Sequence, residues 1–318
     1  MEAIQCILCH RADSSVVIQE NGFSGLQCPS CGLIYISPRP TIREQTRYTQ
    51  HAQRSHSLKS QISLFYGWRL HEKHNLHRIS SYKKTGHLLE LGAGIGTFSD
   101  QAQKSGFSVH CIEPHLEKAD FIRQTTPVTC ETTWLQESTL NHRSFDVIYG
   151  CDVLSHLYDP VADLTVLHGL LAHDGILVLE TGNFADVEKK YFRKIQTFQY
   201  PDHLFFFGER SLKKLLHTTG FSVLAIYRYS LMPLLLFNSM CQCIHRFVSR
   251  GAGQQSDQPA SSRLFQQKLQ AQSDQKLSLR SILRRWYSFV SFVLVYNIGF
   301  VMPKNGRPQT MIVIARKT

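Results

Sequence analysis

Four cysteines near the start of the chain have the spacing of metal ligands. They form two C-x-x-C pairs separated by eighteen residues: Cys6, Cys9, Cys28 and Cys31. Two such pairs supply the four thiolates that bind one tetrahedral zinc ion. Because four protein ligands leave no position open for water, we predict that residues 1–40 form a zinc module with a structural role.

A histidine directly after the first pair allows a second interpretation. Cys6, Cys9 and His10 match C-x-x-C-H, the attachment pattern of c-type haem. Haem attachment needs export, and residues 1–5 show neither the basic start nor the apolar run of a secretory signal. We therefore favour zinc, and we expect a cytoplasmic protein whose thiols are reduced rather than paired in disulfides.

A strand-like apolar run ends in three glycines at alternate positions, Gly92, Gly94 and Gly96. Glycine has no Cβ, so it lets the backbone turn tightly and approach a ligand closely. The spacing differs from the G-x-G-x-x-G of dinucleotide sites. Glu113, at the end of the next apolar run, can accept hydrogen bonds from both hydroxyls of a ribose, each worth roughly 1.5–3 kcal/mol. These residues predict a nucleoside site and leave open which nucleoside it holds.

Short apolar runs alternate with helical patterns from residue 86 onward. We predict strands at residues 87–91, 109–112, 145–149, 176–180, 222–229 and 310–315, and helices at 97–105 and 160–171. This alternation indicates a doubly wound α/β domain, in which helices cover both faces of a parallel sheet. We assign the remaining organisation as a helical linker at 41–84, the domain at 85–230, a helical insertion at 231–309 and a final strand at 310–318.

Four segments of this domain occur in the expected order for class I methyltransferases that use S-adenosylmethionine (SAM). They are the Glu-Leu-Gly-Ala-Gly-Ile-Gly loop that starts at Glu90, the acidic Glu113, residues 145–157 and residues 170–181. The chain resembles that family over roughly residues 85–230. The resemblance implies a Rossmann-like sheet and SAM as cofactor; the alternative is a nucleotide-binding domain with another activity.

The resemblance also implies which residues meet SAM. Glu113 would hold the ribose, and residues 131–135 would lie beside the adenine. The other contacts would come from two loops, one beside the methionine part and one beside the sulfonium: Glu90, Gly92, Gly94 and Gly96, and then Gly150, Cys151 and Asp152.

Two histidines are candidates for proton transfer. Methyl transfer from a sulfonium depends mainly on holding the reacting atoms in line, and a base is needed only where the nucleophile must lose a proton. Open α/β sheets bind ligands at the carboxyl ends of their strands. His156 follows the strand predicted at 145–149, and His203 follows the strand predicted at 176–180. We predict both as candidate bases; the alternative is that each packs and hydrogen-bonds without catalysing.

Positive charge is concentrated in the last quarter of the chain. The formal net charge is +11, and residues 241–318 contain twelve Lys or Arg against two acidic residues, Asp257 and Asp274. This asymmetry favours an anionic partner, such as lipid head groups, nucleic acid or a phosphorylated substrate. A basic face that only aids solubility is the alternative.

The insertion at 231–309 contains a largely apolar run at 286–302 between basic flanks. Ser288, Ser291 and Asn297 interrupt this run, so we do not expect it to span a membrane. Two interpretations remain: a lid over the substrate site, or an interfacial element whose basic flanks meet an anionic membrane surface. A low-complexity stretch at 249–275 is expected to be a linker within the insertion.

Three hypotheses for function follow. The first is an enzyme that methylates a small molecule, with a sugar or a lipid-linked intermediate as candidates; a Cys-rich module before Pro38-Arg39-Pro40 resembles that of some sugar-modifying relatives. The second is a zinc-ribbon RNA methyltransferase, although Gly-Cys-Asp-Val after Tyr149 lacks the Asn/Asp-Pro-Pro-aromatic signature of base methylation. The third is a protein that binds SAM for regulation without turnover. The sequence leaves the oligomeric state open.

Overall fold

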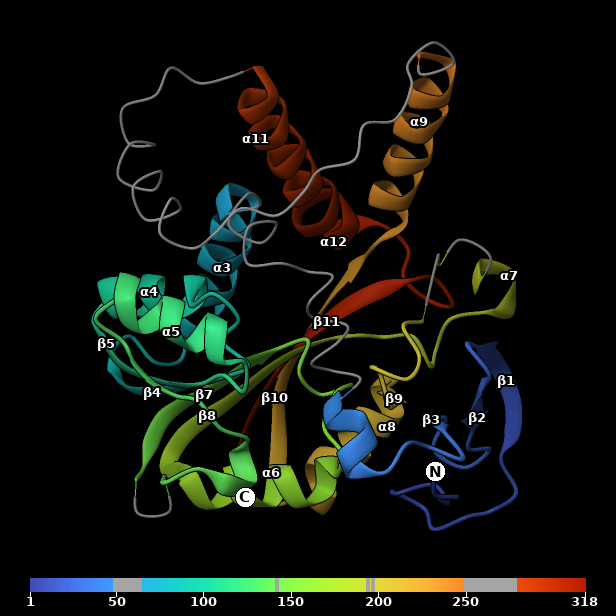
Figure 1. The fold of residues 1–318 in the computed structure, drawn as a ribbon, viewed down its shortest axis with the longest axis horizontal. Coiled ribbons are helices and arrows are strands. Elements are labelled where there is room, and N and C mark those ends of the chain that lie inside the picture. The colour runs from blue at the N-terminus through green and yellow to red at the C-terminus, as the bar shows by residue number, and fades with distance from the viewer. Residues whose placement is uncertain (48–64, 141–142, 193–194, 196–197, 249–278) are drawn as a thin grey trace.

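A seven-stranded sheet forms the centre of the molecule (Figure 1). The computed structural model describes residues 1–47, 65–140, 143–192, 195, 198–248 and 279–318. The strand order is β10-β11-β8-β7-β4-β5-β6, and only β11 runs antiparallel to its neighbours. The strands are β4 (Gly86–Leu91), β5 (Phe107–Ile112), β6 (Thr129–Glu131), β7 (Phe145–Cys151), β8 (Leu171–Gly182), β10 (Phe221–Ser230) and β11 (Gln309–Lys317).

The six strands predicted from the sequence are all present, and β8 is longer than predicted at both ends. The structure adds β6, which has only three residues and one buried side chain, Cys130. Such a short strand has no periodic pattern to reveal it.

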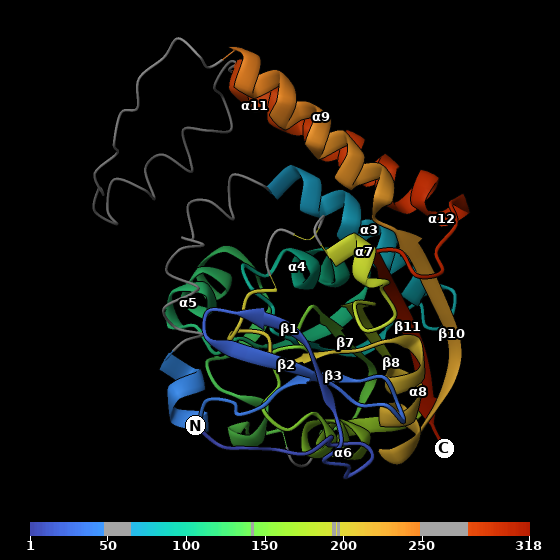
Figure 2. The same ribbon diagram turned by 90° about the vertical axis from the view of Figure 1, so that its right-hand side faces the viewer.

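Helices cover both faces of the sheet (Figures 1 and 2). One face carries α3 (Phe65–Ser80), α4 (Thr97–Lys104) and α5 (Leu116–Thr125), and the other carries α6 (Pro160–Leu170) and α8 (Glu209–Thr218). Successive side chains of a strand point to opposite faces, so Leu88 packs into one core and Leu89 into the other, both fully buried. The predicted doubly wound, Rossmann-like fold is thereby confirmed. The shorter helices are η1 (Leu135–Glu137) and α7 (Lys189–Phe192).

The N-terminal residues form a second, four-stranded sheet with the order β1-β2-β3-β9. Its first three strands are β1 (Ser15–Glu20), β2 (Phe23–Gln27) and β3 (Ile34–Ile36), whereas β9 (Phe205–Phe206) comes from the segment after β8. Ile34 pairs with Phe206 in the antiparallel register, and both side chains are buried in one core with Leu212 and Leu215 of α8. Residues 1–40 therefore share a hydrophobic core with the large domain.

The insertion leaves the sheet between β10 and β11. It contains α9 (Met232–Val248), α11 (Leu279–Phe292), the π-helical turn η2 (Val293–Ile298) and α12 (Gly299–Val301). Because β10 runs parallel to β8, the insertion departs from the edge where the carboxyl ends of the parallel strands lie. Figures 1 and 2 show α9 and α11 projecting beyond the rest of the molecule. The linker predicted at 249–275 lies outside the described residues, and no described helix has the length and apolar character needed to cross a membrane.

Candidate active site

The three glycines between β4 and α4 all have left-handed backbone conformations. Their φ angles are 64° at Gly92, 58° at Gly94 and 75° at Gly96, values that residues other than glycine rarely adopt. A Cβ added at Gly94 would meet no atom within 4 Å, so the space above the loop is open. The loop therefore has open space beside its backbone at the carboxyl end of β4, as a ligand-binding loop requires.

Glu113 lies at the carboxyl end of β5 and holds this loop. Its Oε2 accepts a hydrogen bond from the Gly94 N–H at 2.7 Å, and its Oε1 accepts one from the His115 N–H at 3.0 Å. The side chain is buried, and burial raises the pKa of Glu113. Each carboxylate oxygen keeps lone-pair capacity for a further donor, which matches the two hydroxyls of a ribose. The support that Glu113 gives to the glycine loop was not predicted from the sequence.

One polar atom close to Glu113 in the chain lacks a hydrogen-bond partner within the described protein. The Nε2 atom of His115 is buried and makes no hydrogen bond. Burial lowers the pKa of His115 to about 4, so the ring is neutral near pH 7. Buried polar groups are normally hydrogen-bonded, so an unpaired one beside an open loop is the pattern of a site built for a polar ligand. The residues present therefore fit a nucleoside cofactor.

Two residues predicted to meet SAM are engaged within the protein instead. The Glu90 carboxyl is buried and accepts a hydrogen bond from the Ser99 hydroxyl of α4. Glu131, expected near the adenine, accepts hydrogen bonds from the Thr139 N–H at 3.1 Å and the Thr139 hydroxyl at 2.9 Å. Direct contact of either residue with a cofactor stays a prediction.

The loop after β7 brings Gly150, Cys151 and Asp152 to the same edge of the sheet. Asp152 has a φ of 53°, and its N–H donates to the Glu180 carbonyl at 2.9 Å. Its side chain is exposed to solvent although many protein atoms lie around it, and we call this position the Asp152 recess. Burial and the nearby Glu180 raise the pKa of Asp152 to about 6. An acidic group that still ionises at neutral pH is thus held at the carboxyl end of β7.

The structure brings together the two histidines that the sequence singled out. The rings of His156 and His203 lie edge to face with centroids 4.5 Å apart. Asp202 lies against the first of them: His156 Nδ1 is 3.1 Å from the Asp202 carbonyl oxygen and 3.6 Å from its Oδ2. Burial lowers the pKa of His203 to about 4, whereas Asp202 outweighs burial and raises the pKa of His156. Their role in catalysis stays a prediction.

The N-terminal sheet positions the segment that carries Asp202 and His203. The Glu20 carboxylate accepts hydrogen bonds from the Phe198 N–H at 2.9 Å and the Tyr200 N–H at 2.8 Å. Gln45 Nε2 donates to the Asp202 carbonyl at 3.1 Å. The histidine cluster is therefore held by residues that lie far away in the sequence.

A second polar cluster at this edge was missed by the sequence analysis. Glu180 of β8 is buried and accepts hydrogen bonds from His71 Nε2 at 2.6 Å, Asn75 Nδ2 at 2.5 Å and the Tyr296 hydroxyl at 2.9 Å. These donors outweigh the effect of burial and lower the pKa of Glu180 to about 2. Glu180 in turn raises the pKa of His71 to about 9 against the effect of burial. The only sequence signal was an acidic residue inside an apolar strand.

Three histidines follow one another along α3, at positions 71, 74 and 77. His71 pairs with Glu180, and the Nε2 atom of His74 lies 2.9 Å from the Tyr229 hydroxyl. Of the three, only His77 is exposed. This helix contacts the insertion, since the rings of His74 and Tyr296 lie 4.6 Å apart.

Asp152 lies within electrostatic range of both histidine clusters. His71 and His156 each lower its pKa, in opposition to burial and Glu180. Asp202 likewise acts on the pKa of His115, beside Glu113. The arrangement can bind a nucleoside at one end and deliver or accept a proton at the other.

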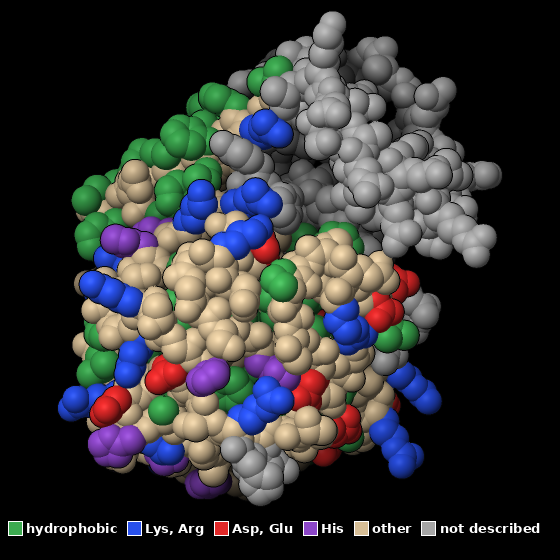
Figure 3. All heavy atoms as spheres, turned by 90° about the vertical axis from the view of Figure 1, so that its left-hand side faces the viewer, with side chains coloured by type: hydrophobic (Ala, Val, Ile, Leu, Met, Phe, Trp, Pro, Cys, Tyr) green, Lys and Arg blue, Asp and Glu red, His purple; other side chains and the backbone are tan. Residues whose placement is uncertain are grey.

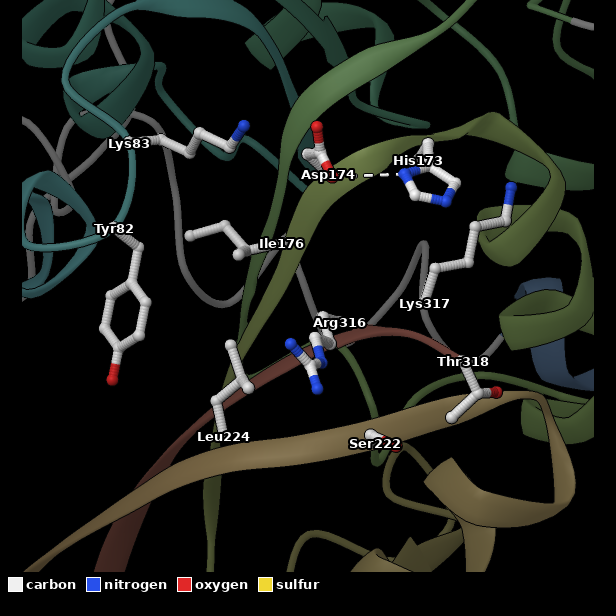
Figure 4. Close-up of a pocket in the computed structure, with 10 residues that line it drawn as sticks. All are labelled: Tyr82, Lys83, His173, Asp174, Ile176, Ser222, Leu224, Arg316, Lys317 and Thr318. Atoms are coloured by element: carbon white, nitrogen blue, oxygen red, sulfur yellow. Dashed lines mark hydrogen bonds and ion pairs between the residues drawn. The ribbon is translucent and has the colours of Figure 1, made fainter.

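A hollow of the described surface lies elsewhere (Figure 4). It has a volume of about 630 Å³ and is bordered by Lys83, Arg316 and Lys317. It also touches Ile176, which pairs with Val147, whereas Cys151 and Glu180 pair four residues farther along the same strands. Four residues of a strand span about 13 Å. The hollow therefore opens at the opposite edge of the sheet and contains none of the predicted site residues.

The four N-terminal cysteines form the predicted cluster. Their Sγ atoms all lie within 4.8 Å of one another, and Cys6 Sγ is 3.6 Å from Cys31 Sγ. Four thiolates around a tetrahedral zinc ion stand about 3.8 Å apart, from a Zn–S distance of about 2.3 Å. Each C-x-x-C pair forms a turn, in which the His10 N–H donates to the Cys6 carbonyl and the Gly32 N–H donates to the Cys28 carbonyl. The cluster therefore fits a tetrahedral metal.

Comparison with known proteins gives a family match. A family model described as a methyltransferase domain matches residues 62–226, more than half of the chain. The ubiquinone biosynthesis O-methyltransferase of Haemophilus ducreyi is 27% identical over 106 residues, which are 30% of this chain and 45% of that protein. The match thus spans less than half the length of that relative.

Solved structures with similar coordinates include two methyltransferases. One is a putative sarcosine dimethylglycine methyltransferase from Galdieria sulphuraria, with a TM-score of 0.48 and 14% identity over 78% of this chain and 85% of that chain. The other is coclaurine N-methyltransferase, with a TM-score of 0.48 and 12% identity over 87% of this chain and 88% of that chain.

The buried pair of His71 and Glu180 has a consequence for stability. Replacing His71 by Gln leaves Glu180 without its cation, and we expect the free energy of unfolding to fall by about 3 kcal/mol near pH 6. Because the pKa of His71 is raised from 6.5 to about 9, this contribution is complete below about pH 6.5 and is lost as the pH rises through 9. Urea unfolding of both proteins at several pH values measures the difference, with His77→Gln as the exposed control. A difference that stays constant up to about pH 9.5 would contradict the charged pair.

Proposed function

Because the chain belongs to the methyltransferase domain family, we propose that it transfers a methyl group from SAM to a small acceptor molecule. The observation that carries the proposal is Glu113, which is buried between the Gly94 and His115 N–H groups beside the open glycine loop. SAM, when bound, supplies a methyl group on a positively charged sulfur. Glu113 would accept the ribose hydroxyls, and the glycine loop would lie along the methionine part.

Asp152 would face the reacting end of the cofactor. Burial and Glu180 raise the pKa of its carboxyl group to about 6, which still leaves the group ionised near pH 7. A carboxylate near neutral pH stabilises a neighbouring positive charge, which suits a sulfonium. Glu180 is already neutralised by His71, so Asp152 is the acidic group of this recess that is left to act on a ligand.

The acceptor would meet the cluster of His156, Asp202 and His203. An acceptor hydroxyl must lose its proton as its oxygen bonds to the methyl carbon, and an imidazole can take that proton. A base works best when its pKa lies near the working pH. Burial lowers the pKa of His203 to about 4, whereas Asp202 raises the pKa of His156, so we choose His156 as the base. Asp202 contacts Nδ1 of His156, which leaves Nε2 to receive the proton. His203 would fix the orientation of the His156 ring.

An oxygen acceptor on a small, apolar or lipid-linked molecule is our choice of substrate class. The proposed role of His156 as a base is consistent with oxygen, since a hydroxyl needs deprotonation, and the Haemophilus relative is named an O-methyltransferase. Methylation of RNA, the alternative suggested by the zinc module, gains no support from these relatives. A regulator without turnover would bind SAM and leave it unchanged.

We further propose that Cys6, Cys9, Cys28 and Cys31 hold a structural zinc ion. The distances between their Sγ atoms and the absence of a fifth ligand group in the described cluster support this choice. The ion would tie the two C-x-x-C turns together and so stabilise the sheet that positions the Asp202 segment.

The cofactor assignment is tested by replacing Glu113. Glu113→Ala removes both acceptors for the ribose, and we expect SAM to bind roughly 10- to 100-fold more weakly in calorimetry. Glu117→Ala, an exposed change four residues along the chain, is the matched control and should bind SAM normally. Unchanged affinity in Glu113→Ala, or tight binding of NAD by the wild type, would overturn the assignment.

The base is tested with labelled SAM and a cell extract. We expect the label to enter small molecules, and His156→Gln to lower the rate by roughly 100-fold or more while SAM affinity stays the same. His203→Gln should have a smaller effect, and the exposed His173→Gln should have none. Mass spectrometry of the product identifies the methylated atom. Label in RNA, or no turnover at all, would reject the small-molecule enzyme.

The zinc site is tested by metal analysis of protein purified without chelator. We expect one zinc per chain, and none in Cys28→Ser. Because β3 pairs with β9, loss of the metal should increase hydrogen exchange most in residues 15–36 and next in residues 198–206. Cys241→Ser, in α9, is the control. Wild-type protein that is folded and free of zinc would refute the site.

A further inference from the structure

The insertion presents an apolar surface that no other described part of the molecule covers. Seventeen large apolar side chains are exposed among the described residues, and ten of them belong to α9, α11, η2 and α12, which together we call the projecting hairpin. These ten are Leu236, Met240, Ile282, Leu283, Trp286, Tyr287, Phe289, Ile298, Phe300 and Val301. Figure 3 shows hydrophobic side chains gathered on the projecting part of the molecule. Contiguous exposed apolar patches of this kind mark sites of association.

The projecting hairpin is a formed element with internal packing. The ring of Phe237 on α9 lies 5.9 Å from that of Tyr287 on α11, and the Tyr287 hydroxyl donates to Asn238 Oδ1 at 2.8 Å. At its base, Phe292 lies 5.2 Å from Tyr296, whose hydroxyl donates to the buried Glu180. The exposed side chains are therefore held in place before any partner arrives.

The sequence of the hairpin is basic, which favours a partner with negative charge. Residues 231–256 and 275–318 contain no acidic residue, whereas Arg280, Arg284 and Arg285 lie in α11 and Lys304 and Arg307 follow α12. Exposed Trp and Tyr side chains between apolar and basic residues match the boundary between acyl chains and anionic head groups. A second copy of the chain fits less well, because a two-fold contact sets this basic surface against itself.

We propose that the projecting hairpin docks onto the surface of an anionic lipid bilayer, with its helices lying in the interface. Apolar side chains enter the outer acyl region, and the basic residues contact head groups, each adding to the attraction. The hairpin starts at Leu231 and returns at Pro308, so docking turns the carboxyl edge of the sheet, with the Asp152 recess, toward the bilayer. Docking itself does not depend on the proposed methyl transfer.

Flotation with vesicles tests the proposal on the full chain. We expect the wild type to float with vesicles of roughly 70% phosphatidylcholine and 30% phosphatidylglycerol at low salt, and about 10-fold less with phosphatidylcholine alone. Replacing Met240, Phe289 and Val301 by Ser should lower binding at least about 10-fold. The matched control replaces three exposed apolar residues outside the hairpin, Val16, Ile42 and Leu224, by Ser and should float like the wild type.

A charge variant tests the second half of the argument. Arg284→Glu with Arg285→Glu should abolish the preference for phosphatidylglycerol, whereas Lys83→Glu with Arg316→Glu, beside the hollow of Figure 4, should not. Circular dichroism and SAM calorimetry check that each variant is folded, so loss of docking is separated from loss of the cofactor site. Wild-type protein that stays in solution with both vesicles, or hairpin variants that float normally, overturns the proposal. A dimer that the apolar variant dissociates, without vesicle binding, assigns the surface to a second copy instead.

Discussion

The buried carboxylate of Glu180 fixes the relative positions of three distant parts of the chain. An unpaired charge at this depth costs several kcal/mol, so the fold must bring donors to it. They come from α3, which supplies His71 and Asn75, and from η2, which supplies Tyr296. The helix before the sheet and the insertion after β10 are thus both held over the carboxyl end of β8. The recess of Asp152 exists because these elements meet there.

A second carboxylate, that of Glu20, holds the segment on the other side of the site in place. The segment between β8 and α8 carries Asp202 and His203, and the regular structure of its described residues is limited to the short helix α7 and the two residues of β9. Its backbone N–H groups are satisfied by the Glu20 carboxylate, and β9 pairs with β3. The N-terminal module therefore serves as part of the frame of the site. Cys6 and Cys31 accordingly share one hydrophobic core with Tyr200 and Leu204, which lie next to the histidine cluster in the chain.

The sequence predicts those features whose physical cause is local. The six long strands follow from apolar periodicity, the cysteine cluster from C-x-x-C spacing, and the place of Glu113 from a glycine loop followed by a strand. What could not be predicted depends on pairs of residues far apart. His71 and Glu180 are separated by 109 positions, and Glu20 and Tyr200 by 180. A histidine on a helix gives no sign of a buried carboxylate elsewhere in the chain.

The position of the projecting hairpin follows from the same topology. In the sheet, β10 is the edge strand and β11 lies between it and β8. Residues inserted between β10 and β11 therefore leave the sheet at its edge. The insertion is not loosely tethered there: a Cβ at Gly299 would lie 2.4 Å from the Ser230 carbonyl oxygen, so only glycine allows α12 to approach the end of β10 this closely. Tyr296, three residues earlier, reaches Glu180. Any surface that meets the hairpin is consequently held in a fixed orientation to the recess, through one close backbone contact and one buried hydrogen bond.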